Sequence, residues 1–378
     1  MFHVMVEKND LLKLLTKAQS ITYKKSTMVV LNNILLYTDK NNLFIERTDL
    51  EISYKGKTEC EVIEQDSITI PAKKIYELIK EFPNTKIEIK EIENERISIT
   101  SEDKTKYIIA GYRVPDFPKF PIVDTSNSFK VKANKLKALF DKVLFSVSSD
   151  ETKYSLSALL VDKITDENKI SIRTVGSDGH RLSYYQIDID DNFEINDNDI
   201  LIPKKIANEI RKFIDTSNDS ITFGIFNDLG FVISENEEMV FRLMDGNYPD
   251  YKRIISYKKD RFFDINRSDF YEILKRISIL TPDVLTRGVI SKIDSDRIQV
   301  ELINKEFGEA KEIMNIKYDG DGFTFAFNAK YMMDVLNVMQ SDEVTIVVNE
   351  GLTPCIIEGK DDPGFLGLIM PMTLNENN

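Results

Sequence analysis

The residue types of a serine hydrolase stand together in Ser177-Asp178-Gly179-His180, where a hydroxyl, a carboxylate and an imidazole fall within four positions. In such an enzyme the hydroxyl attacks a carbonyl carbon while the imidazole accepts its proton. The three groups have to converge from separate elements, whereas close neighbours on an extended chain point to alternating sides or follow a turn. His180 is one of only two histidines in the chain. The spacing therefore argues against His180 as a catalytic base.

A second candidate is the segment Tyr318-Asp-Gly-Asp-Gly-Phe, which is similar in composition to a calcium-binding loop. It lacks the full series of oxygen ligands and the closing glutamate of such a loop, so we expect a tight turn.

With 63 acidic residues, no single carboxylate pair stands out for acid–base catalysis. The sequence predicts a protein that is not an enzyme and has no cofactor or metal site. A cytoplasmic hydrolase that uses acidic residues remains the alternative.

Composition indicates a soluble globular protein with several domains. The chain has 378 residues, of which 42% are hydrophobic and 30% charged, which is enough to bury a core in two to four domains. No apolar run approaches the length of about 18 residues that spans a bilayer. The cysteines Cys60 and Cys355 stand almost three hundred residues apart, so neither a disulfide framework nor a metal cluster is indicated. We expect a cytoplasmic protein.

The elements that would position these residues recur three times along the chain. Alternating segments that lead into an amphipathic helix begin 125 and then 134 residues apart, at Val4, Phe129 and Phe263. Strands that run into a second helix recur 132 and then 125 residues apart, at Pro71, Pro203 and Asn328. Proline is favoured at the first helical position and asparagine as an N-cap, so these three residues are expected to begin the second helix of each repeat.

Each repeat is expected to hold two helices against strands. Apolar residues at spacings of three and four predict helices at residues 8–19, 71–81, 132–143, 203–213, 266–276 and 328–339. Alternating runs such as 86–90 and 171–175 lie between the helices and are typical of antiparallel strands. The sequence therefore predicts an α+β protein of three repeated domains, at residues 1–125, 126–257 and 258–378. An ordinary multidomain protein without special geometry is the competing interpretation.

Positive charge is concentrated on the predicted helices. The formal net charge of the chain is −13, but the six helical segments together carry +10, so the remainder carries −23. Helices that are positive in an otherwise acidic chain indicate a basic surface suited to phosphates, because lysines attract them without reading bases. A scaffold that binds proteins but not DNA is a further alternative. The lysines that follow Pro71 and Pro203 argue against it.

Several ordered motifs resemble the bacterial DNA polymerase III beta subunit, the β sliding clamp family. They are Ser177-Asp-Gly-His-Arg-Leu, Met244-Asp-Gly-Asn-Tyr-Pro-Asp-Tyr-Lys-Arg-Ile, Asn328-Ala-Lys-Tyr-Met-Met-Asp-Val-Leu-Asn and Ile369-Met-Pro-Met. The resemblance runs from end to end. It implies a DNA-clamp fold, a ring-shaped head-to-tail homodimer around double-stranded DNA, and sequence-independent contacts. It also implies the clamp loader complex, the replicative DNA polymerase and other clamp-binding-motif proteins as partners.

The resemblance also carries over three sets of site residues. The DNA-binding set is Lys25, Lys73, Lys74, Lys153, Lys204 and Lys205. The partner-peptide pocket is expected at Leu156, Ser177, Gly179, His180, Arg181, Leu182, Pro249, Ile254, Pro354, Leu368 and Met370. The dimer interface is expected at Ile109, Ile279 and Leu280. One pocket per protomer is expected, because the matching stretch of the first repeat, Thr48-Asp-Leu-Glu, lacks the Gly-His-Arg series.

Overall fold

The computed structural model describes the chain in thirteen segments. These are residues 1–21, 28–83, 85–103, 105–113, 117–166, 169–191, 193–195, 199–214, 220–256, 259–280, 288–304, 306–349 and 353–372, the first two being separated by the stretch that holds Lys25. The chain forms two compact units, of residues 1–136, 190–194 and 208–243 and of residues 137–189, 195–207 and 244–378. The described helices are all too short or too polar to cross a bilayer.

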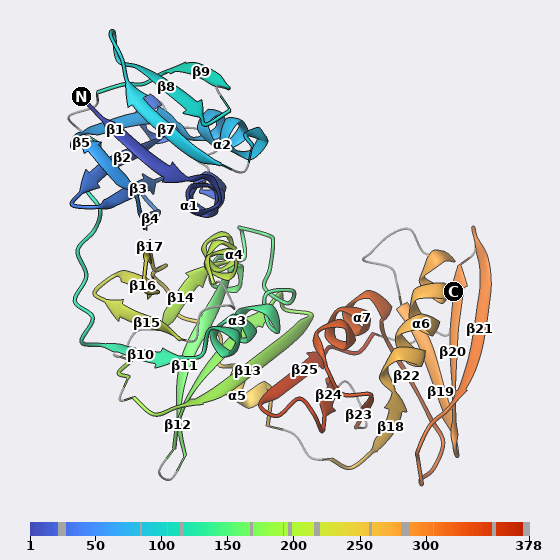
Figure 1. Ribbon diagram of the computed structural model, residues 1–378. Coiled ribbons are helices and arrows are strands. Elements are labelled where there is room, and N and C mark those ends of the chain that lie inside the picture. Colours follow the sequence, from blue (N-terminus) through green and yellow to red (C-terminus); the bar gives the residue numbers. More distant parts are fainter. Residues whose placement is uncertain are drawn as a thin grey trace. The chain divides into compact units, whose positions relative to one another are not determined.

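The first unit contains two antiparallel sheets (Figure 1). In spatial order the five-stranded sheet consists of β5 (Glu61–Glu64), β1 (His3–Glu7), β7 (Lys86–Glu91), β8 (Arg96–Ser101) and β9 (Lys106–Ala110). The eight-stranded sheet consists of β10 (Ser128–Val131), β15 (Ile221–Phe226), β16 (Leu229–Ile233), β17 (Glu237–Arg242), β4 (Ile52–Glu59), β3 (Asn42–Thr48), β2 (Asn33–Asp39) and β6 (Ser67–Pro71). Helices α1 (Lys8–Ser20) and α2 (Ala72–Glu81) pack against each other, and η1 (Val29–Asn32) precedes β2.

The second unit repeats this plan. Its eight-stranded sheet consists of β14 (Ile200–Pro203), β11 (Ala158–Asp166), β12 (Lys169–Ser177), β13 (Arg181–Ile189), β25 (Phe365–Ile369), β24 (Cys355–Gly359), β23 (Glu343–Val347) and β18 (Phe262–Asn266). Its four-stranded sheet consists of β21 (Gly308–Asn315), β20 (Arg297–Asn304), β19 (Gly288–Asp294) and β22 (Phe323–Asn328). Its helical elements are η2 (Tyr154–Ser157), α5 (Tyr251–Ile254), α6 (Arg267–Ile277), η3 (Ser278–Leu280) and α7 (Ala329–Val338).

Residues of the central repeat contribute to both units. Helices α3 (Ala133–Asp141) and α4 (Lys204–Phe213) each supply residues to the two units. Together with α1, α2, α6 and α7, they confirm the six helices predicted from apolar spacing, with ends that differ by one or two residues. All strand pairs in the four sheets are antiparallel, which confirms the predicted α+β class.

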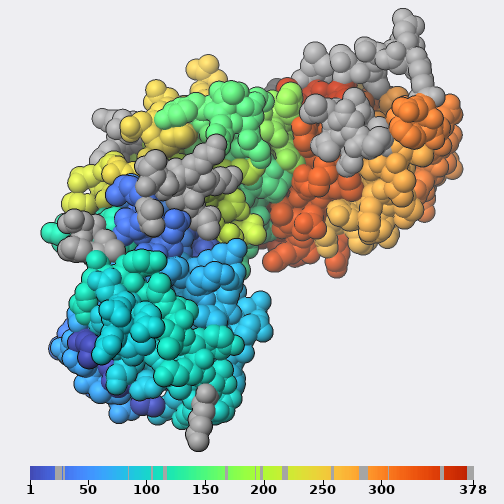
Figure 2. Space-filling view, turned by 90° about the horizontal axis from the view of Figure 1, so that it is seen from above, coloured from blue at the N-terminus to red at the C-terminus, as the bar shows by residue number. Residues whose placement is uncertain are grey.

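Consecutive repeats are joined by paired strands. In the first unit, β17 of the central repeat pairs with β4 of the first repeat, and Phe241 lies opposite Ile52. In the second unit, β25 of the third repeat pairs with β13 of the central repeat, and Ile369 lies opposite Arg181. Figure 2 shows the side chains of the green central segment and the red C-terminal segment packed against each other within this unit. Each eight-stranded sheet is therefore built from two repeats.

The helix starts follow the prediction at Asn328 but not at the two prolines. The Asn328 side chain accepts hydrogen bonds from the backbone nitrogens of Lys330 and Tyr331, as an N-cap does. Pro71 and Pro203 were expected at the first helical position, but each is the last residue of a strand, one position earlier. Both strands lie at the edge of their sheet, where a residue without an N–H group removes no ladder hydrogen bond.

Two of the lysines counted as helix charge lie inside the protein. Lys17 Nζ lies 2.5 Å from Glu237 Oε2, and Lys142 Nζ lies 2.5 Å from Asp362 Oδ1. All four side chains are at least 88% buried. The expectation that the helix lysines form one exposed basic surface is therefore wrong for these two residues, because their charge is neutralised within the fold.

Candidate functional site

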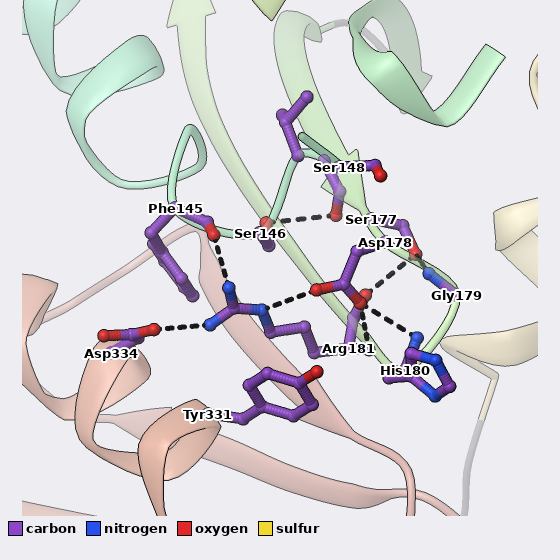
Figure 3. Close-up of polar contacts among 12 residues, drawn as sticks. Phe145, Ser146, Ser148, Ser177, Asp178, Gly179, His180, Arg181, Tyr331 and Asp334 are labelled. Atoms are coloured by element: carbon purple, nitrogen blue, oxygen red, sulfur yellow. Dashed lines mark hydrogen bonds and ion pairs between the residues drawn. The ribbon is translucent and has the colours of Figure 1, made fainter. Parts of the chain in front are cut away.

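The Ser177–Arg181 segment is a tight turn between β12 and β13 (Figure 3). The Asp178 carboxylate accepts hydrogen bonds from the backbone nitrogens of His180 (2.9 Å) and Arg181 (3.1 Å). Ser177 Oγ donates to the Arg181 carbonyl (2.8 Å) and accepts from the Gly179 nitrogen (3.1 Å). Gly179 has φ +89°, a backbone conformation that favours glycine. The hydroxyl and the carboxylate therefore build the turn, and the exposed His180 side chain lies outside this arrangement.

The same turn occurs in the first repeat, between β3 and β4. Thr48 Oγ1 donates to the Ile52 carbonyl (3.0 Å) and accepts from the Leu50 nitrogen (2.9 Å). The Asp49 carboxylate accepts from the backbone nitrogens of Glu51 and Ile52. Leu50 has φ +76° at the position that Gly179 occupies in the central repeat. The hydroxyl–carboxylate pair is thus a structural feature of the repeat, which explains why Ser177 and Asp178 occur together without forming a catalytic set.

Arg181 fixes the turn from the other side. Its guanidinium donates to Asp178 Oδ2 (3.0 Å), Asp334 Oδ2 (2.6 Å) and the Phe145 carbonyl (2.7 Å). The Tyr331 ring covers it, with 4.4 Å between the guanidinium carbon and the ring centroid (Figure 3). The side chain is only 12% exposed. Arg181 therefore connects the β12–β13 turn to helix α7 of the third repeat, and both sides of the repeat junction hold it.

Sequence reasoning missed three of the four residues that contact the Arg181 guanidinium, all except Asp178. Phe145 follows α3, and Tyr331 and Asp334 lie on α7, about 150 residues along the chain from Arg181. Both α7 residues stand in the motif Asn328-Ala-Lys-Tyr-Met-Met-Asp, which was a mark of the resemblance and not a source of site residues. Only the folded chain brings these groups together.

Apolar residues of the predicted pocket meet where β13 pairs with β25. Leu182 lies directly opposite Leu368, and both are buried in one core cluster. The Met370 nitrogen donates to the His180 carbonyl (2.8 Å), which continues the pairing beyond the strands. Met370 itself is 39% exposed. Leu182 and Leu368 therefore form the floor of this region, while Met370 lies at its surface.

A second wall comes from η2. The Ser148 nitrogen donates to the carbonyls of Leu156 (2.9 Å) and Ser177 (3.2 Å), which holds η2 beside the turn. A Cβ atom on Gly179 would lie 3.9 Å from Leu156 Cδ1. Lys153 Nζ donates to the Asp178 carbonyl (2.8 Å). The structure thus places Lys153, a predicted DNA contact, against the turn of the predicted pocket.

The remaining pocket residues lie on neighbouring segments of the same unit. Pro249 and Ile254 are exposed on the segment whose Tyr248 and Tyr251 enter the core beneath Leu182. Burial raises the pKa of the Tyr248 hydroxyl, so this group is neutral. Pro354 directly precedes β24, which pairs with β25. The eleven predicted residues therefore all lie in the second unit, on segments around the apolar core that contains Leu182 and Leu368.

The predicted DNA-binding lysines differ in how far they reach into solvent. On α2, Lys73 is 82% exposed, and both Lys73 and Lys74 pair with Glu77, at 3.7 Å and 3.2 Å. Such exposed pairs are weak and exchange readily with other anions. Lys25 lies outside the described residues.

The two lysines that begin α4 are not equivalent. Lys205 is exposed, whereas Lys204 is half-buried, and its Nζ donates to the Val147 carbonyl and to Ser149 Oγ (2.9 Å). Burial, together with the positive charge of Arg181, lowers the pKa of Lys204. Lys204 therefore holds the segment after α3 as well as lying at a predicted DNA-contact position.

The predicted interface residues lie at the two ends of the repeat series. Ile109 is on β9, which is an edge strand of the five-stranded sheet. Ile279 and Leu280 are in η3, which contacts β21, an edge strand of the four-stranded sheet. Ile279 is 78% exposed, whereas Leu280 packs partly against the core of the third repeat. The structure describes Ile109 in one unit and the other two residues in the other unit.

Family models match almost the whole chain in order. The N-terminal, central and C-terminal domains of the DNA polymerase III beta subunit match residues 2–121, 130–250 and 252–373. A beta sliding clamp from Haemophilus influenzae is 26% identical over 370 residues, covering 98% of this chain and 99% of the relative. A beta sliding clamp from Chlamydia pneumoniae is 27% identical over 375 residues, covering 99% of each.

Solved structures show the same fold. The griselimycin-bound sliding clamp from Pseudomonas aeruginosa has a TM-score of 0.91 at 24% identity, covering 99% of this chain and all of that one. A sliding clamp from Caulobacter crescentus, with polyethylene glycol bound to a putative beta-motif tethering region, has a TM-score of 0.90 at 24% identity and the same coverage. The three matched domains, in family order along nearly the whole length, show that this chain belongs to the DNA polymerase III beta subunit family and has its three-domain clamp fold.

Proposed function

We propose that this sliding clamp encircles duplex DNA as a head-to-tail homodimer and tethers the replicative DNA polymerase without catalysing a reaction. The observation that carries the proposal is the ordered match of all three beta-subunit domains. The family match gives no support to the hydrolase alternative, and the groups of the Ser177–Arg181 segment are used within its turn. We place the domain boundaries after residues 125 and 257 and the protein in the cytoplasm, where its DNA is.

Strand pairing within the chain supports closure of a ring. Each junction between consecutive repeats is an antiparallel pair, of β17 with β4 and of β25 with β13. In the first repeat β9 takes the place of β17 and β25, and in the third repeat β21 takes the place of β4 and β13. In the described part of the chain, β9 and β21 are both edge strands of their sheets. Both carry exposed apolar residues, such as Tyr107 and Ile108 on β9 and Ile313 on β21. Exposed apolar edges favour pairing with another strand, and a head-to-tail second copy would cover both.

Lysines suit a clamp that slides. An ammonium group on a flexible stem attracts phosphates without base specificity, and its contacts exchange quickly. Lys73, Lys74 and Lys205 are exposed enough for this role, and Lys153 is exposed beside η2. We assign Lys25 and Lys204 to the same set, with Lys204 also holding the segment after α3.

Partner proteins would dock on the apolar region around the β12–β13 turn. A short peptide with glutamine, leucine and phenylalanine side chains fits a surface that has an apolar floor and a few fixed polar groups. The exposed Met370 and the partly buried Leu156 would contact it above the buried Leu182 and Leu368. The clamp loader complex, the polymerase and other clamp-binding-motif proteins would share this region.

The topological link is tested by loading the protein on a nicked circular DNA with a matching clamp loader and ATP. The protein should stay on the closed circle through gel filtration and slide off after the circle is cut once. A protein that stays bound equally well to cut DNA, or never loads with an active loader, would contradict the ring.

The peptide site is tested separately by fluorescence anisotropy with a labelled peptide of that composition. Met370→Asp should weaken binding at least tenfold while leaving thermal unfolding unchanged, because the side chain is partly exposed. Lys259→Asp, at an exposed residue of the same unit that is not among the predicted pocket residues, is the control. Equal affinity of wild type and Met370→Asp would refute this placement of the pocket.

A further inference from the structure

A buried ion pair recurs at the two repeat junctions inside the chain. In the first unit Lys17 binds Glu237, and in the second unit Lys142 binds Asp362. Both pairs join residues 220 positions apart and have the same 2.5 Å separation. Lys17 lies in the first helix of the first repeat, and Lys142 directly follows the first helix of the central repeat. Glu237 begins the last strand of the central repeat, and Asp362 lies in the turn before the last strand of the third repeat.

The register of the repeats points to a third cation of this kind. The first helices begin at Lys8, Ala133 and Arg267, which are 125 and then 134 residues apart. The same steps lead from Lys17 to Lys142 and from there to Arg276. In the proposed ring, the repeat that follows the third one is the first repeat of a second copy, whose last strand is β9. Its preceding turn carries Asp103, three residues before β9, just as Asp362 stands three residues before β25.

We propose that Arg276 of one copy binds Asp103 of a second copy and so forms the interface counterpart of the two internal ion pairs. The inference rests on the proposed head-to-tail ring. Arg276 already binds Glu312 of its own β21 through Nε (3.0 Å) and Nη2. A guanidinium has five N–H donors, so it can bind a second carboxylate at the same time. More than half of the Arg276 side chain is exposed, so its cation is accessible to a second copy.

Hydrogen bonds within its own turn hold the Asp103 carboxylate in place for this contact. Its Oδ1 accepts hydrogen bonds from Ser101 Oγ and from the Thr105 nitrogen (3.3 Å). These bonds fix the carboxylate in the turn between β8 and β9, and the residue is exposed. In the proposed arrangement this turn lies beside α6 of the neighbouring copy, as the turn that holds Asp362 lies beside Lys142. Each ring would contain two such pairs, one at each interface.

The pair is tested by mixing two charge-reversed variants, Arg276→Glu and Asp103→Arg. Each variant alone places like charges at both interfaces and should dissociate at least roughly tenfold more readily than wild type in sedimentation velocity. An equimolar mixture should recover the wild-type dissociation constant, because one interface of the mixed dimer is native and the other carries the reversed pair. Asp103→Asn keeps the Oδ1 acceptor of the turn and should weaken the dimer less than Asp103→Arg.

Lys275→Glu is the matched control, because Lys275 is the exposed neighbour of Arg276 and pairs with Glu272 of its own helix (3.5 Å). It should leave the dissociation constant within about twofold of wild type. A mixture that dissociates as readily as its two components would overturn the pair and leave Arg276 serving only Glu312. A wild-type chain that stays monomeric would overturn the ring itself, so the two failures are distinguishable.

Discussion

Replacing Arg181 by methionine should strongly destabilise the second unit. The guanidinium makes three charge-assisted hydrogen bonds, to Asp178, Asp334 and the Phe145 carbonyl, and the side chain is only 12% exposed. Such a bond contributes roughly 1.5–3 kcal/mol when it is buried. Methionine keeps much of the apolar contact with Tyr331 but removes all three bonds.

The expected loss is smaller than the sum of the three bonds. The Asp178 and Asp334 side chains are 17% and 20% exposed, so water can partly replace the lost partner. We therefore expect a fall in the free energy of unfolding of roughly 3 kcal/mol. Lysine should recover less than half of it, because an ammonium cannot reproduce the planar fork of a guanidinium.

The assay is urea unfolding at constant protein concentration, with hydrogen exchange at the β13 amides to locate the change. With a denaturant slope of about 2 kcal/mol per molar, the midpoint should fall by roughly 1.5 M. Arg253→Met is the matched control, because Arg253 also pairs with an aspartate three residues earlier but is 87% exposed. A similar shift in both variants, or none in Arg181→Met, would refute the argument that this side chain fixes the repeat junction.

Three further predictions concern the buried Lys142–Asp362 pair, the predicted DNA-contact lysines of α2 and the dimer interface. Burial alone would raise the pKa of Asp362, but hydrogen bonds from Lys142 and neighbouring groups lower it overall, so its stabilising effect is complete above about pH 4 and is lost as the pH falls through the folded-state value. Lys142→Met should therefore cost roughly 3 kcal/mol at pH 7 and progressively less in more acidic urea titrations, whereas a constant cost would contradict the role of its charge. Substituting Lys73 and Lys74 by alanine should reduce the salt dependence of DNA binding by roughly 0.9 per lost phosphate contact, and dimer mass should not change; an unaltered salt slope would count against them. Leu280→Asp should give monomers by light scattering, and an unchanged dimer mass would argue against this interface.

The periodic elements could be predicted because their signals are local. Apolar residues at helical spacing located the six helices of nine or more residues in the described part of the chain, and Asn328 caps α7 as predicted. The helices after Pro71 and Pro203 begin one residue later than predicted, because sequence preference did not reveal that each proline ends an edge strand. The sheets that span two repeats could not be predicted from these local signals, since their strands are far apart along the chain.

The charges show the same limit. Lys17 and Lys142 were counted in the positive net charge of the predicted helices. Both are buried against acidic residues 220 positions away along the chain. Sequence distance hides such pairs, because a lysine on a helix face looks the same whether solvent or another repeat covers it. The repeat register supplies the missing information, since two observed pairs at the same repeat position indicate where a third belongs.

Comparison of the two similar turns separates features of the fold from features of the site. Thr48 and Asp49 make the same hydrogen bonds in the first repeat as Ser177 and Asp178 make in the central repeat, so these bonds need no functional explanation. The repeats differ at the position of Arg181, where the first repeat has Ile52. Ile52 is buried and has no cation, so this turn cannot bind an acid on a neighbouring helix as Arg181 binds Asp334. The difference supports a single peptide pocket in each protomer, at the turn that the arginine holds.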